Sequence, residues 1–312
     1  MAGTKMASQV PVIVFSEECM KPGTSSWAEA CKVMVQALQD HGCFIVDHPN
    51  APLGLHDSVF SVTEDLFDLP AETKIKNTNY KRPLGVVGTT PGSPLIEALT
   101  IDGAEKLQEC EKFTSLMWPS GNDHFCKAVH DYGKFIAELE KVVFKMVCEN
   151  YGVEKCYDPY IDLISYLLRF LKYKKPEGVE ASVNPTEHTD KSFLSYLHQN
   201  NIRGLEVRTK DGEWFTFEPS ASNFMVMAGD ACAAWSNGRI KACDHRVAVT
   251  EESQVRYSLG AFSYVTGMIE TPKEFIDEAH PQQCKPFNHI DLLSHHDCSD
   301  NLIKSSCGVL AN

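Results

Sequence analysis

The chain has 312 residues, 43% of them hydrophobic, and a formal net charge of -13. This length suits one large domain or two modest ones, and the apolar content allows a sizeable core. The negative charge argues against nucleic acid or an anionic membrane surface as the main partner, because both repel an acidic protein.

The cysteine pattern and the hydropathy indicate a soluble protein with free thiols. Twelve cysteines are scattered from Cys19 to Cys307 without a C-x-x-C pair. Residues 1–9 contain no long apolar run of the secretory type, and no stretch is long enough to span a membrane. We therefore expect a cytoplasmic location in which the thiols stay reduced.

The first half of the sequence predicts mainly helices. A strand is expected over 10–15, a helix from a capping box at Ser26 and Glu29 to about His41, and a strand over 43–46. Further helices are expected over 53–68, 71–75 and 121–151, the last with apolar residues at helical spacing. The Gly- and Pro-rich stretch 80–92 predicts irregular or weakly extended structure.

The second half predicts many short strands. Residues 166–173 alternate, 204–209 and 213–217 flank an Asp-Gly turn, and strands follow at 223–228, 242–249 and 255–265. Such antiparallel strands predict a jelly roll of the cupin type. We predict one domain over 1–312: a helical N-terminal part at 1–160, a β core at about 161–268, and a C-terminal helix (272–278) with a tail at 269–312.

Two histidines and a carboxylate form the candidate metal centre. His188 and Asp190 leave one face of an extended chain, and His245 lies in a later strand that can return beside them. Two histidines and one carboxylate are typical of non-haem Fe(II) oxygenases, where they leave coordination positions open. A lone His-x-Asp is common and does not by itself identify a metal site.

The strand that follows His245 strengthens the metal interpretation. Arg256 and Ser258 share one face of it, and a guanidinium beside a hydroxyl is suited to bind a carboxylate. With His188, Asp190 and His245 in this order, the pattern favours a metal site with an adjacent anion site.

This order of motifs resembles the plant Fe(II)/2-oxoglutarate-dependent dioxygenase superfamily over nearly the whole chain. The segments 10–16 and 42–48 are similar to the first strands of that family. The segments 188–192, 237–239, 280–281 and 285–287 look most like one subgroup, which contains enzymes that modify glucosinolate side chains and auxin-oxidising dioxygenases.

The resemblance implies the fold and the chemistry. The jelly roll is then a double-stranded β-helix with an N-terminal helical extension. Fe(II) is expected on His188, Asp190 and His245, and the cosubstrates are 2-oxoglutarate and O2, with ascorbate as a supporting reductant. The far carboxylate of 2-oxoglutarate is expected on Arg256 and Ser258.

Tyr173 stands where many family members use a tyrosine hydroxyl for the same carboxylate. The usual Asn-Tyr-Tyr-Pro is replaced here by residues 172–176, Lys-Tyr-Lys-Lys-Pro. An ordinary strand aromatic therefore remains an alternative for Tyr173.

The expected reaction is hydroxylation of an unactivated C–H bond, coupled to decarboxylation of 2-oxoglutarate to succinate and CO2. The substrate is expected to be a small specialised metabolite or hormone, such as an alkaloid, a steroidal glycoalkaloid, a glucosinolate or an auxin. Candidate apolar walls of its pocket are Phe193, Trp235 and Phe262, each of which could equally be core. By resemblance, Val87 is expected to border this pocket and 292–293 to close over its mouth.

Other functions stay open at this point. The same site could demethylate or desaturate its substrate, and a non-haem iron oxidase that needs no 2-oxoglutarate has a similar triad and Arg-x-Ser. A non-catalytic binding module and a zinc hydrolase are further alternatives, although Glu187 is the one spare carboxylate evident for a hydrolytic base. We expect a monomer.

Overall fold

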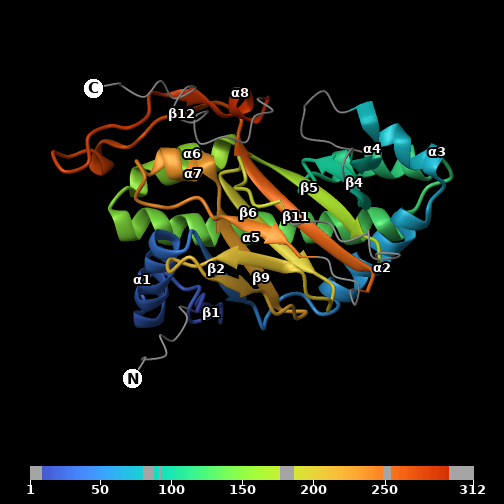
Figure 1. The fold of residues 1–312 in the computed structure, drawn as a ribbon, viewed down its shortest axis with the longest axis horizontal. Coiled ribbons are helices and arrows are strands. Elements are labelled where there is room, and N and C mark those ends of the chain that lie inside the picture. Colours follow the sequence, from blue (N-terminus) through green and yellow to red (C-terminus); the bar gives the residue numbers. More distant parts are fainter. Residues whose placement is uncertain (1–8, 80–87, 91–92, 176–185, 249–253, 295–312) are drawn as a thin grey trace.

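The large β-sheet organises the protein. The computed structural model describes residues 9–79, 88–90, 93–175, 186–248 and 254–294. The sheet has eight strands, which lie side by side (Figure 1) in the order β1 (Val12–Val14), β2 (Cys43–Asp47), β9 (Asn223–Ala228), β6 (Leu194–Gln199), β11 (Arg256–Val265), β5 (Ile164–Tyr173), β4 (Ser93–Asp102) and β3 (Gly88–Thr90). Neighbours are antiparallel except β1 and β2.

A second sheet of three strands covers part of one face of the large sheet. It consists of β10 (His245–Val247), β7 (Leu205–Arg208) and β8 (Trp214–Thr216), with β7 in the middle. The predicted Asp-Gly hairpin is confirmed, since β7 pairs antiparallel with β8 and Gly212 has a φ of 83°. The apolar residues between the sheets form one cluster, which includes Ile45, Val207 and Met225.

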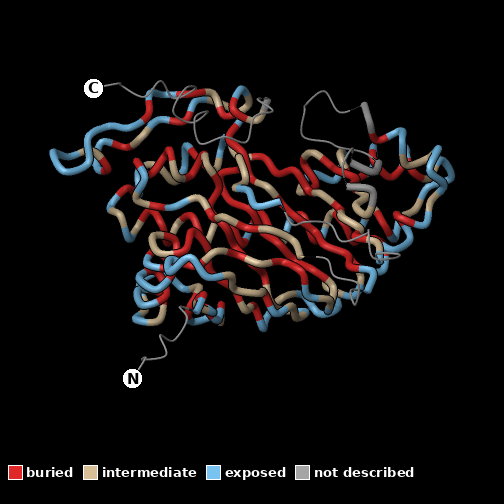
Figure 2. The backbone as a smooth tube through the Cα atoms, in the orientation of Figure 1, coloured by how far each residue is buried: buried red, intermediate tan, exposed pale blue. Residues whose placement is uncertain are grey.

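Helices cover the opposite face of the large sheet. They are α1 (Ser25–Asp40), α2 (Leu55–Asp68), α4 (Leu107–Met117) and the long α5 (Asp123–Tyr151). Buried residues from these helices and the sheet form the main hydrophobic core (Figure 2). With two packed sheets and this helical layer, the predicted double-stranded β-helix core with an N-terminal helical extension is confirmed.

Strand alternation explains why both faces of the sheet are covered. In β9, Phe224 and Val226 belong to the core on the helix side, whereas Met225 and Met227 belong to the cluster between the sheets. Successive side chains of a strand point to opposite faces, so a strand with two buried faces has to be apolar throughout.

The shorter elements connect these layers. They are α3 (Ala71–Lys74), η1 (Ile75–Asn79), η2 (Glu154–Cys156), α6 (Tyr157–Leu163), α7 (Asp230–Trp235), β12 (Met268–Ile269), η4 (Lys273–Phe275), β13 (Phe287–Asn288) and α8 (His289–Ser294). The elements β4, α4 and α7 were not predicted from the sequence. Most of the irregular stretch 80–92, including Val87, lies outside the described residues.

Two local predictions are wrong. The cap of α1 is Thr24 and not Ser26, because the Thr24 hydroxyl accepts the N–H of Trp27 at 3.1 Å and the helix starts at Ser25. The helix predicted over 272–278 is only the short turn η4. There the Asn237 side-chain amide donates to the carbonyls of Phe275, His280 and Pro281, which holds this segment in a bent path.

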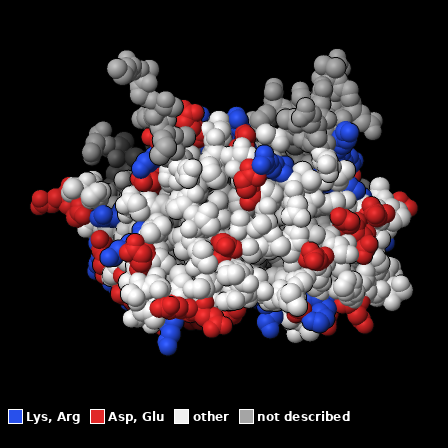
Figure 3. Space-filling model, turned by 90° about the horizontal axis from the view of Figure 1, so that it is seen from below, with Lys and Arg blue, Asp and Glu red and all other residues white. Residues whose placement is uncertain are grey.

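The surface agrees with the acidic composition. On the face drawn in Figure 3, the described Lys and Arg side chains are separated and lie among Asp and Glu. Among the described helices, none combines the length and apolar character needed to cross a bilayer. The cysteines in the described part of the chain are free thiols.

Candidate active site

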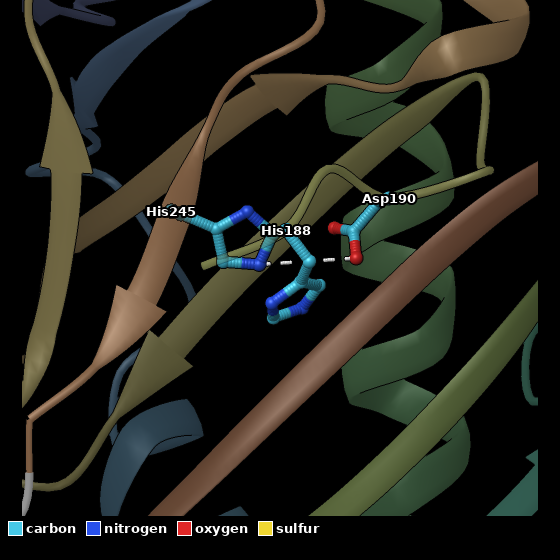
Figure 4. A group of neighbouring side chains, drawn as sticks. All are labelled: His188, Asp190 and His245. Carbon is cyan, nitrogen blue, oxygen red and sulfur yellow. Dashed lines mark ion pairs between the residues drawn. The ribbon is translucent and has the colours of Figure 1, made fainter. Parts of the chain in front are cut away.

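His188, Asp190 and His245 come together at the edge of the small sheet. His188 and His245 pair across an isolated antiparallel bridge, with backbone N–H to O distances of 3.1 and 3.0 Å. One possible ligand atom from each of the three side chains lies within 4.8 Å of the others, and Asp190 Oδ1 is 3.8 Å from His245 Nε2. Figure 4 shows the three side chains pointing toward one another. One ion with bonds of about 2 Å fits such spacing.

Backbone contacts orient both imidazoles. His188 Nδ1 lies 3.0 Å from the Thr186 carbonyl, and His245 Nδ1 lies 3.2 Å from the Cys243 carbonyl. A hydrogen on each Nδ1 satisfies these carbonyls and leaves Nε2 with a lone pair for a metal. Burial lowers the pKa of His245, which favours the neutral, ligating form.

Asp190 is held by groups that the sequence analysis did not single out for this role. The Ser195 hydroxyl, which is fully buried, donates to Asp190 Oδ2 at 2.6 Å and lies 2.7 Å from the Ser192 hydroxyl. The Asp230 N–H donates to the Asp190 carbonyl at 2.7 Å. A Cβ at Gly229 would lie 2.1 Å from the Ser192 carbonyl oxygen, so only glycine lets the chain pass here.

Arg256, Ser258 and Tyr173 also come together, on the face of the large sheet that the small sheet covers. Arg256 is opposite Tyr173 in the β11–β5 register, and its guanidinium carbon lies 4.6 Å from the Tyr173 ring centroid. Arg256 Nη2 lies 3.4 Å from the Ser258 hydroxyl. Gln199 of β6 joins them, because its side-chain oxygen accepts from Arg256 Nε at 3.1 Å and also from Nη2.

This cluster of buried polar groups has the properties of an anion site. Arg256 Nη1 and Gln199 Nε2 are buried and have no hydrogen-bond acceptor among the residues that the structure describes. A buried donor without an acceptor costs about 1–3 kcal/mol, and more when it is charged. Burial lowers the pKa of Arg256, yet a guanidinium keeps its charge in proteins. A carboxylate from outside the chain would satisfy these donors, so the residues fit the far end of 2-oxoglutarate.

A cavity of about 210 Å³ lies beside Asp190. Its walls include Asp190, Arg169 and Leu167, with Phe262 from β11 and Leu293 from α8. Of the predicted apolar walls, Phe262 lines the cavity. Residues 292–293 were predicted to close over the mouth of the substrate pocket, and Leu293 lies in the lining of this cavity.

Phe193 and Trp235 lie elsewhere. Both are buried in the main core on the helix side, where each ring centroid is within 5.6 Å of the Phe144 ring centroid. They are not among the residues that line the cavity beside Asp190. The spare carboxylate of Glu187 pairs with Arg208 on the surface, so the base that a zinc hydrolase needs is already engaged.

Comparison with known proteins identifies the family. Residues 163–263 match the 2OG-Fe(II) oxygenase superfamily, and residues 10–115 match the family described as "non-haem dioxygenase in morphine synthesis N-terminal". A probable 2-oxoglutarate-dependent dioxygenase AOP1 of Arabidopsis thaliana is 38% identical over 292 residues, which cover 91% of this chain and 95% of the relative.

Solved structures agree with the sequence relatives. The dioxygenase for auxin oxidation (DAO) in rice superimposes with a TM-score of 0.80 at 26% identity, and the match covers 96% of this chain and 99% of the rice chain. The 2-oxoglutarate complex of the Arabidopsis thaliana protein AtDAO1 has a TM-score of 0.77 at 25% identity, covering 88% and 100%. The chain therefore belongs to the 2OG-Fe(II) oxygenase superfamily and is an iron- and 2-oxoglutarate-dependent dioxygenase of the AOP and DAO type.

Proposed function

We propose that this dioxygenase hydroxylates an unactivated C–H bond of a small specialised metabolite or hormone and converts 2-oxoglutarate to succinate and CO2. The observation that carries the proposal is the joint placement of two sites: the cluster of His188, Asp190 and His245, and the Arg256 anion site. One holds a metal and the other a carboxylate. A single 2-oxoglutarate would use both, with its keto acid end at the metal and its far carboxylate at Arg256.

Each part of the chain has its own task in this scheme. His188, Asp190 and His245 would hold Fe(II), with Nε2 of each histidine and a carboxylate oxygen of Asp190 as ligand atoms. Bound Fe(II) would activate O2, whose four-electron reduction draws two electrons from 2-oxoglutarate and two from the substrate. Arg256, Ser258 and Tyr173 hold and orient the far carboxylate of 2-oxoglutarate. The apolar walls of the cavity exclude water and place the substrate carbon beside the metal, which decides the regiochemistry.

The position of the substrate in the site decides the outcome of the oxidation. Hydroxylation of a methyl carbon on nitrogen or oxygen gives demethylation, and removal of a second hydrogen gives a desaturated product. The rice and Arabidopsis structural relatives are named for auxin oxidation. Auxin-like acids therefore stand beside glucosinolates, alkaloids and steroidal glycoalkaloids as substrate candidates.

We further propose that the chain is one domain, 1–312, that acts as a monomer on a small molecule in the cytoplasm. The main core joins residues of α1, α5 and β11 from distant parts of the sequence, which supports a single folding unit. Size-exclusion chromatography with light scattering tests the monomer.

The test is an anaerobic titration of the purified protein with Fe(II) and 2-oxoglutarate, followed through the weak visible charge-transfer band of the chelate. His188→Ala is expected to abolish the band, and Arg256→Ala is expected to raise the 2-oxoglutarate concentration needed for it. Arg203→Ala, at an exposed arginine paired with Glu218, is the matched control and should leave the band unchanged.

Two outcomes contradict the proposal in different ways. Failure of the wild-type protein to bind iron removes its basis. Iron binding without a band or succinate formation supports the alternative of an iron oxidase that does not use 2-oxoglutarate.

A further inference from the structure

His289 is a fully buried histidine at the start of α8, and both of its ring nitrogens have a backbone partner. Nδ1 accepts the Val265 N–H at 3.0 Å, and Nε2 lies 2.9 Å from the Lys191 carbonyl oxygen. The N–H of His289 itself donates to the Gly267 carbonyl at 3.2 Å. The side chain therefore joins the C-terminal helix both to the end of β11 and to the residue that follows Asp190.

These two contacts define one tautomer of the imidazole. Nδ1 receives a hydrogen from the Val265 amide, so the hydrogen of the neutral ring is on Nε2, which donates to the Lys191 carbonyl. Burial lowers the pKa of His289 to about 4. The ring is therefore neutral at physiological pH and keeps both bonds there.

The bond to Val265 completes the edge of β11. The register of β11 with β6 ends at Phe262, whereas the register with β5 continues to Val265. The Thr266 N–H donates to the Leu163 carbonyl beside β5, so the preceding N–H, that of Val265, points to the other side. A buried N–H needs an acceptor, and His289 supplies it where β6 no longer does. This bond anchors the start of α8 to the large sheet.

The bond to Lys191 acts on the loop that carries Asp190. Residues 191–193 form bends, so the regular ladder of a strand does not fix them. The Asp230 N–H holds the start of the loop by donating to the Asp190 carbonyl at 2.7 Å, and a backbone hydrogen bond of 2.8 Å to β11 holds its end. His289 holds the Lys191 carbonyl between these two points.

We propose that His289 is a positioning residue of the iron site, whose bond to the Lys191 carbonyl holds the loop so that the Asp190 carboxylate faces the two metal-binding histidines. This inference rests on the proposed role of Asp190 as a metal ligand. The same bond keeps α8 beside the loop. Leu293, about one turn after His289 and on the same face of this helix, lines the cavity beside Asp190. One side chain thus sets the metal loop and a wall of the cavity relative to each other.

Two substitutions separate the two bonds, and anaerobic calorimetry of Fe(II) binding is the readout. His289→Asn places a side-chain oxygen near the position of Nδ1 and can keep the bond to Val265. His289→Gln places an amide nitrogen near the position of Nε2 and can keep the bond to Lys191. His289→Asn is expected to weaken Fe(II) binding about 3- to 10-fold, less than the roughly 10- to 100-fold loss when a direct partner of a metal ligand is removed. His289→Gln should bind Fe(II) nearly as tightly as the wild type.

Asn237→Gly is the matched control for a loosened C-terminal segment. The Asn237 side-chain amide donates to the carbonyls of Phe275, His280 and Pro281, and glycine tolerates the φ of 54° at this position. The control should lower the melting temperature and leave the iron affinity unchanged. A purely structural role of His289 would give the same result in His289→Asn.

Hydrogen exchange in the wild-type protein tests the inference without a variant. The Nε2–H of His289 is followed by NMR in protein that contains isotope-labelled histidine, with and without Zn(II) as a diamagnetic substitute for Fe(II). Because coupling between two sites is reciprocal, the bound metal should slow this exchange by a factor similar to the affinity loss, about 3- to 10-fold.

Three results overturn the inference. They are wild-type iron affinity in His289→Asn, an equal loss of iron affinity in His289→Asn and His289→Gln, and exchange of the Nε2–H that metal binding does not slow. The exchange measurement decides the question if the variants do not fold. A wild-type protein that binds no iron refutes the proposed function instead, so the two failures are distinguishable.

Discussion

Ser195 is expected to tune the iron affinity without touching the metal. Its hydroxyl donates to Asp190 Oδ2 at 2.6 Å and is fully buried, so water cannot replace it in Ser195→Ala. Loss of such an outer partner of a metal ligand costs about 10- to 100-fold in metal affinity. This corresponds to about 1.4–2.8 kcal/mol, within the range for hydrogen bonds to charged groups.

The assay is anaerobic calorimetry of Fe(II) binding to the wild type and to Ser195→Ala. Ser236→Ala is the matched control, because Ser236 is equally buried but bonds only to the backbone, through the Ala233 carbonyl and the Ile240 N–H. The control should lose thermal stability and keep its iron affinity. If Ser195→Ala binds Fe(II) as tightly as the wild type does, the hydrogen bond does not hold Asp190 for the metal and the reasoning is refuted.

Three further substitutions test other parts of the structure. Burial raises the pKa of the Glu140 carboxyl to about 8, although hydrogen bonds, including one from the Tyr160 hydroxyl, lower it. In the unfolded chain this carboxyl loses its proton near pH 4.5. The wild-type free energy of unfolding should therefore fall as the pH rises from about 4.5 to 8, by at most about 3–5 kcal/mol. In urea titrations Glu140→Gln should remove most of this fall, and an unchanged pH dependence would show that Glu140 is ionised in the fold. Gly229→Ala places a Cβ against the Ser192 carbonyl and should lower stability by about 1–3 kcal/mol together with iron affinity; a variant with wild-type calorimetry contradicts the close approach. Trp214→Ala removes the ring on which two arginines stack, at 4.0 and 5.2 Å, and should cost about 1–2 kcal/mol of unfolding free energy, while an unchanged melting temperature would contradict a stabilising stack.

The sequence predicted those parts of the site that depend on local spacing. His188 and Asp190 are two residues apart, and Arg256 and Ser258 share a strand face, so their side chains converge by local geometry alone. Gln199 could not be found in this way. It meets Arg256 because β6 pairs with β11 in a register that sets Gln199 opposite Ser258, and registers between distant strands are not visible in one sequence.

The incorrect choice of apolar walls has a related cause. Phe193 was expected near the site because it follows the metal ligands on the strand face of Lys191, but residues 191–193 form bends and β6 begins only at Leu194. The parity of a strand does not continue through bends, and Phe193 enters the core on the helix side. Trp235 ends the short helix α7, and its ring lies in the same core.

The division of labour along β11 connects the fold with its chemistry. Tyr257, Leu259 and Ala261 belong to the main core, so this strand is fixed on one face by packing. The alternate residues Arg256 and Ser258 belong to the anion site, and Phe262 lines the cavity. These two sets of residues alternate along β11. A substitution at Phe262 therefore need not alter the core, and a substitution in the core need not alter the anion site of Arg256 and Ser258. A fold built in this way can keep the iron and 2-oxoglutarate sites constant while residues that line the cavity, such as Phe262, change.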